Sequence, residues 1–165
     1  MYVFEIDADA PKTALYADVL SAAAALTDGE HDGIANMANV AALLWQYLPD
    51  LNWAGFYRMG QSANGVAELV LGPFQGKAAC IRIPVGKGVC GAAALNGEVQ
   101  CVEDVHAFPG HIACDGDSRS ELVAPIMRDG KVIAVIDLDS PIIARFDAAD
   151  VAGIMALASL LASRI

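Results

Sequence analysis

The chain opens with two segments whose apolar residues recur at helical spacing. The first runs from about Pro11 to Leu26, with the proline at the start of the helix, where a missing N–H does little harm. The second runs from about Gly33 to Leu48, and Pro49 ends it. Its repeating positions are Ile34, Met37, Ala38, Ala41, Leu44, Trp45 and Leu48. The pattern predicts two helices ahead of any strand.

The period then changes to that of β-strands. WAGFYRM (53–59) and VAELVLG (66–72) flank an Asn64-Gly65 turn signal and predict a hairpin. The segments that follow are predicted as a strand at 79–85, a short helix at 88–95, a strand at 98–104, a hairpin at 121–139 and a terminal helix with Asp147 as its N-cap. This order predicts an α+β fold, with helices packed on an antiparallel sheet.

The turn at 128–130 allows two registers in the last hairpin. A two-residue Asp129-Gly130 loop would place Arg128 opposite Lys131, with like charges facing each other. A three-residue loop with Gly130 in the left-handed position would instead pair Met127 with Lys131. The three-residue loop is therefore the predicted one.

In that register Glu121 faces Asp137 at the end of an apolar ladder, and Asp139 lies on the same side of the sheet. Facing carboxylates destabilise a strand pair, and a partly buried pair would keep one carboxyl protonated. Such a pair points to a cationic ligand or to acid catalysis. The alternative, that these acids mark the solvated end of the hairpin, stays open.

Trp53 and Tyr57 are four residues apart in a predicted strand, so they share one face. They would give the carboxylates an apolar wall. Aromatic residues in strands belong to the core more often than to a ligand site, so this pattern alone does not decide between the two.

Length, charge and apolar runs limit the class of protein. A chain of 165 residues favours one domain, so residues 1–165 are expected to form a single domain. The apolar share is 56%, yet the run at 151–163 is shorter than the about 18–20 residues that cross a membrane. The net charge of −10 and the lack of a basic segment predict no nucleic-acid and no membrane partner. Without a secretory signal, a cytoplasmic location is expected.

Cytosolic thiols are kept reduced, so the four cysteines are not expected to form a structural disulfide framework. Cys114 lies in an aperiodic stretch at 105–120, and such long loops in compact domains are usually functional or disordered. Cys101, in a predicted strand, is interpreted as a small buried apolar side chain. Since no C-x-x-C spacing exists, no metal and no cofactor are expected.

Five blocks of sequence resemble the free methionine-R-sulfoxide reductases, a family of single GAF domains. They are LNWAGFY, LVLGPFQGKAACIRIPVGKGVCG, EDVHAFPGHIACD, SELVAPI and VIDLDSP, in the family's order. The resemblance covers about Thr13 to Leu161 and implies a GAF-like fold, with a central antiparallel sheet flanked by N-terminal and C-terminal helices.

The resemblance also implies a role for each matching residue. These are Cys114 as the catalytic cysteine, Cys80 as the cysteine that resolves it, Cys90 as a third, assisting cysteine, Trp53 and Tyr57 as the wall around the sulfoxide end of the substrate, and Glu121, Asp137 and Asp139 as the carboxylates that hold the substrate. No family cysteine is expected at Cys101. The order in which Cys80 and Cys90 act is left open.

The activity implied by the resemblance is reduction of free L-methionine-(R)-sulfoxide to methionine. Cys114 would attack the sulfoxide sulfur while Glu121 supplies a proton. The resulting sulfenic acid would become an intramolecular disulfide that a thioredoxin-like partner reduces. A homodimer would be an ordinary assembly for such a domain. Two alternatives stay open, a GAF module that senses a small molecule without chemistry and a thiol redox sensor.

Overall fold

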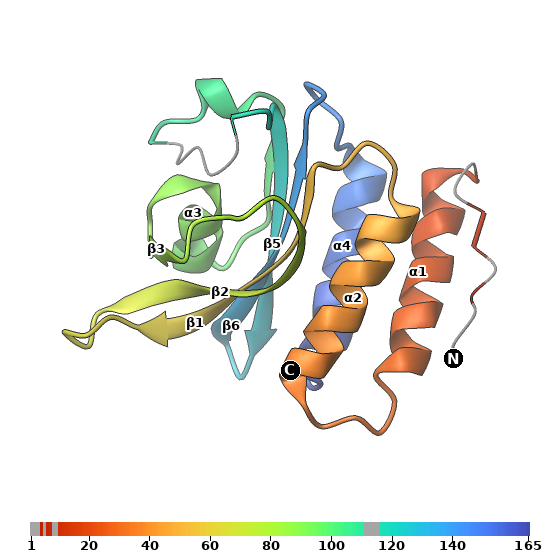
Figure 1. Ribbon diagram of the computed structural model, residues 1–165, viewed down its shortest axis with the longest axis horizontal. Helices are drawn as coiled ribbons and strands as arrows, with labels where there is room; N and C mark the ends of the chain where they lie inside the picture. Colours follow the sequence, from red (N-terminus) through yellow and green to blue (C-terminus); the bar gives the residue numbers. More distant parts are fainter. Residues whose placement is uncertain (1–3, 5, 8–9, 111–115) are drawn as a thin grey trace.

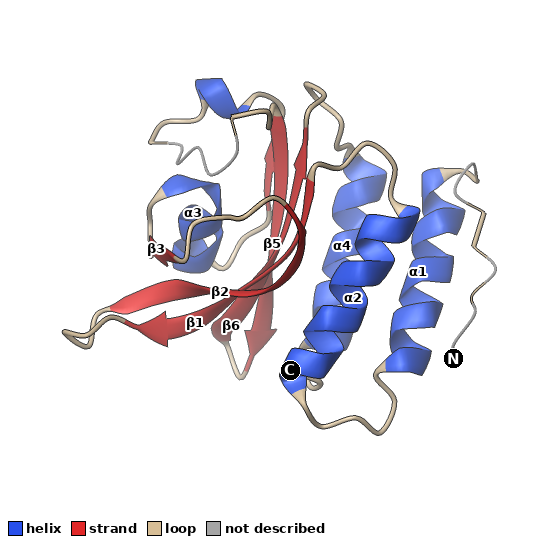
Figure 2. Ribbon diagram, in the orientation of Figure 1, coloured by secondary structure: helices blue, strands red, loops and turns tan. Residues whose placement is uncertain are grey.

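The computed structural model describes residues 4, 6–7, 10–110 and 116–165. Within these residues, six strands form an antiparallel sheet in the order β3-β2-β1-β6-β5-β4 (Figure 2). The strands are β1 (Trp53–Gln61), β2 (Ala67–Gly76), β3 (Arg82–Pro84), β4 (Gln100–Val102), β5 (Ser120–Arg128) and β6 (Lys131–Ser140). The helices are α1 (Lys12–Leu26), α2 (Gly33–Tyr47), α3 (Gly88–Asn96) and α4 (Ala148–Leu161), with a 3₁₀ turn η1 (Val105–Ala107). The predicted α+β fold is confirmed.

The sheet carries helices on both faces. Helices α2 and α4 cover one face, with α1 packed outside them, and α3 lies on the other face (Figure 1). The first face buries the larger apolar cluster, which includes Leu44, Phe56, Ile136 and Leu157. The second cluster forms under α3 and contains Trp53 and Tyr57. Two of the candidate site residues, Trp53 and Tyr57, therefore lie on the face that α3 covers.

Side-chain caps explain where α2 and α4 begin. The Asp32 carboxylate accepts from the backbone N–H of Ile34 (2.8 Å) and Ala35 (3.1 Å), which caps α2. Helix α4 begins with a capping box between Asp147 and Asp150, which confirms Asp147 as the predicted N-cap.

Asp150 also ties α4 to α1. Its side chain is fully buried, and it lies 2.5 Å from Lys12 Nζ and 2.7 Å from the Arg145 guanidinium. The Tyr16 hydroxyl donates a hydrogen bond of 3.0 Å to the same carboxylate. Gly153 lets the two helices approach, since a Cβ there would lie 2.2 Å from the Tyr16 ring. This network and close approach fix α1 on the outside of the helical layer.

Three residues whose spacing predicted α2, Ile34, Ala38 and Trp45, are exposed and do not lie in the core. Ile34 is 45% exposed and Trp45 is 41% exposed. The buried face follows Asn36, Met37, Val40, Ala41, Leu43 and Leu44 instead. The burial of Asn36 is tolerated because its amide donates hydrogen bonds to the carbonyl of Arg164 (2.7 Å) and to that of Glu30 (3.2 Å).

The predicted three-residue loop of the last hairpin is wrong. Asp129 and Gly130 form a two-residue turn, both at positive φ (49° and 73°), and Arg128 lies opposite Lys131. Two left-handed residues match the twist of the flanking strands. The charge repulsion is relieved because the Arg128 guanidinium turns to the end of α4, where it donates to the Ala162 oxygen (2.7 Å) and to an Ile165 oxygen.

Other expectations for the strands also need correction. The strand predicted at 79–85 is limited to β3, so Cys80 lies in the loop before it. Cys101 was expected to be buried, but it is exposed on β4, which is an edge strand of the sheet. The stretch at 105–120 contains η1, and Ser120 already belongs to β5. Among the described residues, no helix is long and apolar enough to cross a membrane.

Removal of the Asp150 carboxylate should destabilise the fold strongly. In Asp150→Ala the Lys12 and Arg145 cations lose their shared partner, and the free energy of unfolding should fall by about 3–5 kcal/mol. Asp147→Ala is the matched control. It removes a cap that is 57% exposed and should cost about 1 kcal/mol. Urea denaturation followed by circular dichroism measures both, and equal losses would contradict the assigned role of the network.

Candidate active site

A pocket opens on the face of the sheet that α3 covers. Its walls come from β1, β5, β6, the start of α3 and the loop that precedes β3. The lining residues that matter for chemistry are Trp53, Tyr57, Lys87, Cys90, Ser118, Glu121, Asp137 and Asp139. Six of these eight were singled out from the sequence, and the fold brings them together.

The register of β5 and β6 places the carboxylates. Glu121 pairs with Asp139, and Val123 pairs with Asp137, so the predicted facing of Glu121 and Asp137 is wrong. The two-residue turn shifts the pairing by one position, and a bulge at Ile126/Met127 shifts it by another. Because side chains alternate with a period of two, the combined shift keeps all three acids on one face. The three acids therefore share one face of the sheet, as predicted, although the register differs from the predicted one.

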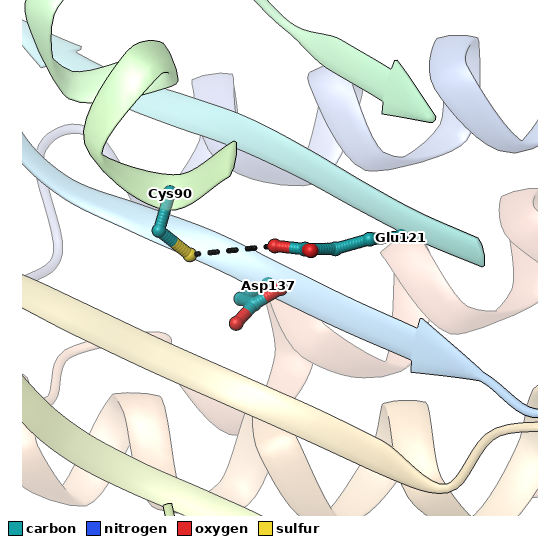
Figure 3. Close-up of side chains that lie close together, drawn as sticks. All are labelled: Cys90, Glu121 and Asp137. Atoms are coloured by element: carbon teal, nitrogen blue, oxygen red, sulfur yellow. Dashed lines mark hydrogen bonds between the residues drawn. The ribbon is translucent and has the colours of Figure 1, made fainter. Parts of the chain in front are cut away.

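Cys90 meets two of these acids in the pocket (Figure 3). Its thiol donates to Glu121 Oε1 with an Sγ–Oε1 distance of 3.9 Å. Cys90 Sγ, one carboxylate oxygen of Glu121 and one carboxylate oxygen of Asp137 all lie within 4.8 Å of one another. Glu121 and Asp137 are each only 6% exposed, and Cys90 is 3% exposed. The alternative that the acids mark a solvated hairpin end does not hold for Glu121 and Asp137.

Burial and mutual repulsion shift the acid–base behaviour of this cluster. Burial raises the pKa of Glu121 well above its ordinary value, and the negative charges of Asp137 and Asp139 raise it further. Burial raises the pKa of Asp137 to about 7. Burial and the same carboxylates also raise the pKa of the Cys90 thiol. The cluster therefore holds protons at neutral pH, and Cys90 is a thiol there rather than a thiolate.

Aromatic rings form the opposite wall of the pocket. The Trp53 and Tyr57 rings are stacked with centroids 5.8 Å apart, and Phe74 stacks on Trp53 at 5.2 Å. The indole N–H of Trp53 donates to the Lys77 carbonyl at 3.1 Å, which fixes the ring against the loop before β3. Phe74 was missed from the sequence because nothing in its spacing separates it from an ordinary strand residue.

Two polar contacts join segments at the rim. Lys77 Nζ lies 2.5 Å from Asp117 Oδ2, and the Asn52 amide donates to Ser118 Oγ at 3.0 Å. The first connects the loop that carries Cys80 with residues 116–119, ahead of β5, and the second connects the residue just before β1 with the same segment. Cys114 lies outside the described residues. Cys80 is partly buried in its loop, and Ala78 and Ala79 just before it line the pocket.

Lys87 is the basic residue among the described lining residues. It precedes α3 by one position and was not singled out from the sequence. Its place in "GKGVCG", three residues before Cys90, is the signal that could have identified it.

Comparisons with known proteins agree on the family. The GAF domain family matches residues 19–165. The free methionine-R-sulfoxide reductase of Escherichia coli is 49% identical over 91% of this chain and 88% of its own, and the Saccharomyces cerevisiae protein of the same name is 46% identical over 82% and 77%. The structure of free methionine-R-sulfoxide reductase from Neisseria meningitidis in complex with its substrate superposes with a TM-score of 0.92 at 43% identity, covering 99% of this chain and 95% of that one.

The buried carboxyls should make stability depend on pH. Between the ordinary value of 3.8 and about 7, the folded protein binds a proton at Asp137 that the unfolded chain does not bind, so stability falls as pH rises through this window. Asp137→Asn should therefore reduce the slope and raise the free energy of unfolding at pH 8 by roughly 1–3 kcal/mol. Urea denaturation at pH 5 and pH 8 measures this. Asp129→Asn, in the exposed turn, should keep the wild-type slope, and an unchanged slope in Asp137→Asn would refute the shift.

Proposed function

Because this chain belongs to the free methionine-R-sulfoxide reductases, a family of GAF-domain proteins, we propose that it reduces free L-methionine-(R)-sulfoxide to L-methionine as a single-domain enzyme. One observation carries the proposal beyond the family. A buried pair of carboxyl groups, Glu121 and Asp137, lies in a pocket whose other wall is a stack of Trp53 and Tyr57. This combination suits a small amphipathic cation with one apolar end.

The α-ammonium group of a free amino acid accounts for the acids. Asp137 and Asp139 are the partners proposed for it, since a cation near a buried carboxylate offsets the cost of the carboxylate's charge. Methionine sulfoxide inside a peptide has no such group at this position. The aromatic wall packs against the methyl sulfoxide end, with Trp53 held in place by its bond to the Lys77 carbonyl.

The chemistry proposed for the pocket needs a nucleophile and an acid. The Cys114 thiolate attacks the sulfoxide sulfur and forms a sulfur–sulfur bond while the sulfoxide oxygen takes up a proton. The resulting hydroxyl group passes from the substrate sulfur to the Cys114 sulfur as the sulfur–sulfur bond breaks, so methionine leaves and Cys114 becomes a sulfenic acid. Glu121 is the proposed acid because its raised pKa keeps it protonated at neutral pH.

Cys80 is the proposed resolving residue. Its thiolate attacks the sulfenic sulfur of Cys114, water leaves, and the disulfide is then reduced by a thioredoxin-like dithiol. The contact of Lys77 with Asp117 supports this assignment. Cys80 lies three residues after Lys77 in the sequence, and Cys114 lies three residues before Asp117. Cys90 is a poorer resolving candidate, since burial raises its pKa and disfavours the attacking thiolate.

Single-turnover and steady-state assays with free methionine-R-sulfoxide test the proposal. Cys114→Ser should lose turnover entirely. Cys80→Ser should release about one methionine per protein without reductant, since the sulfenic acid still forms. Cys101→Ser, at an exposed free thiol, should match wild type in both assays. Multiple turnovers by Cys114→Ser would refute the assignment, and binding without turnover by wild type would favour a GAF sensor instead.

Glu121→Gln separates the acid role from binding. It should lower kcat at pH 7 by roughly 100-fold, because the amide cannot donate a proton to the leaving oxygen. Glu98→Gln, at an exposed position before β4, should leave kcat unchanged. The measurement is the rate of methionine release in a single turnover at saturating substrate. An undiminished rate in Glu121→Gln would transfer the acid role to another group.

A further inference from the structure

We propose that the same pocket binds a thiophilic divalent cation, Zn²⁺ or Cd²⁺, through Cys90 Sγ and one carboxylate oxygen each from Glu121 and Asp137. The bound cation would exclude the substrate. Residue spacing alone did not predict such a site, because its three ligands come from α3, β5 and β6 and have no motif spacing.

The distances are close to those a tetrahedral ion requires. Zn–S bonds of about 2.3 Å and Zn–O bonds of about 2.0–2.2 Å put neighbouring ligand atoms roughly 3.3–3.7 Å apart. Cys90 Sγ and Glu121 Oε1 are 3.9 Å apart, and the three ligand-type atoms lie within 4.8 Å of one another. Figure 3 shows Cys90 and Glu121 pointing toward each other, with Asp137 beside them. Small side-chain adjustments would complete three of the four positions, leaving one open to the pocket.

An unsatisfied oxygen supports the site independently. Among the described residues, Asp137 Oδ1 is fully buried and has no hydrogen-bond partner, and the residue is only 6% exposed. Most buried polar groups in folded proteins are hydrogen-bonded, so an exception needs an explanation. A cation seated between Asp137, Glu121 and Cys90 would supply the missing partner.

The ligand chemistry selects the class of ion. One sulfur and two carboxylate oxygens suit Zn²⁺ or Cd²⁺ better than Mg²⁺, which prefers oxygen ligands and retains its water. Cys90 must lose its S–H proton to solvent as the metal–sulfur bond forms, and a protonated carboxyl must do the same. Asp139 adds a further negative charge, whereas Lys87 opposes the cation. Exposed Ala78 and Lys87 line the pocket, so ions can enter from solvent.

The functional consequence rests on the proposed reductase activity. The substrate's ammonium group and the metal ion would share Asp137, so each would exclude the other. Inhibition by Zn²⁺ or Cd²⁺ should then raise the apparent KM for free methionine-R-sulfoxide and leave kcat nearly unchanged when a non-thiol reductant maintains turnover.

Direct binding is tested without any activity assay. In a Cys80→Ser/Cys101→Ser/Cys114→Ser background, Cys90 is the one remaining thiol of the chain's four, so a cadmium–thiolate charge-transfer band in the ultraviolet reports on Cys90 alone. Titration with Cd²⁺ should saturate at one ion per chain. Adding Cys90→Ser should abolish the band, and adding Asp137→Asn should weaken binding at least 10-fold. Asp129→Asn, in the exposed turn, is the control and should change nothing.

The outcomes separate this proposal from the reductase assignment. Circular dichroism first establishes that each variant is folded, and Glu121→Gln replaces Asp137→Asn if the latter is not. A missing band, or a Kd unchanged by both carboxylate variants, would overturn the metal site while leaving the reductase proposal intact. A saturable band in the triple-serine background, together with a wild-type protein that does not reduce free methionine-R-sulfoxide, would do the reverse.

Discussion

The burial of two neighbouring carboxyl groups, Glu121 and Asp137, is the constraint on which the pocket depends. Both lie on one face of the sheet because side chains alternate along β5 and β6. Two buried negative charges this close would be costly, so the pair retains protons, as the raised pKa values of both groups indicate. A cationic ligand can offset the same cost, and this links the stability of the fold to the chemistry of the site.

The two faces of the sheet divide structure from function. Under α2 and α4 the core is apolar, and the buried carboxylate of Asp150 at its edge is satisfied by Lys12, Arg145 and Tyr16. Under α3 the carboxylates of Asp137 and Asp139 repel a negative charge on Glu121, and Asp137 Oδ1 has no hydrogen-bond partner among the described residues. A well-paired network on one face can hold the sheet in place while the other face keeps a strained cluster ready for ligand.

The sequence was sufficient for the fold class and for much of the pocket, but not for its geometry. Alternation alone placed Glu121, Asp137 and Asp139 on one face, and that survived a wrong register because the turn and the bulge together shift the pairing by two positions. The turn was missed because Arg128 finds partners on α4, far along the chain. Cys90 could not be joined to the acids from spacing, because the approach of α3 to β5 and β6 is a tertiary contact.

The buried pair of Glu121 and Asp137 carries fewer than two negative charges at neutral pH. Carbon-13 NMR of the side-chain carboxyls of Glu121 and Asp137, followed from pH 4 to pH 9 in ligand-free reduced protein, tests it most directly. Both resonances should show coupled titrations, with Asp137 changing near pH 7 and Glu121 still protonated there. Two independent titrations complete below pH 5 would instead show that both groups are ionised at neutral pH.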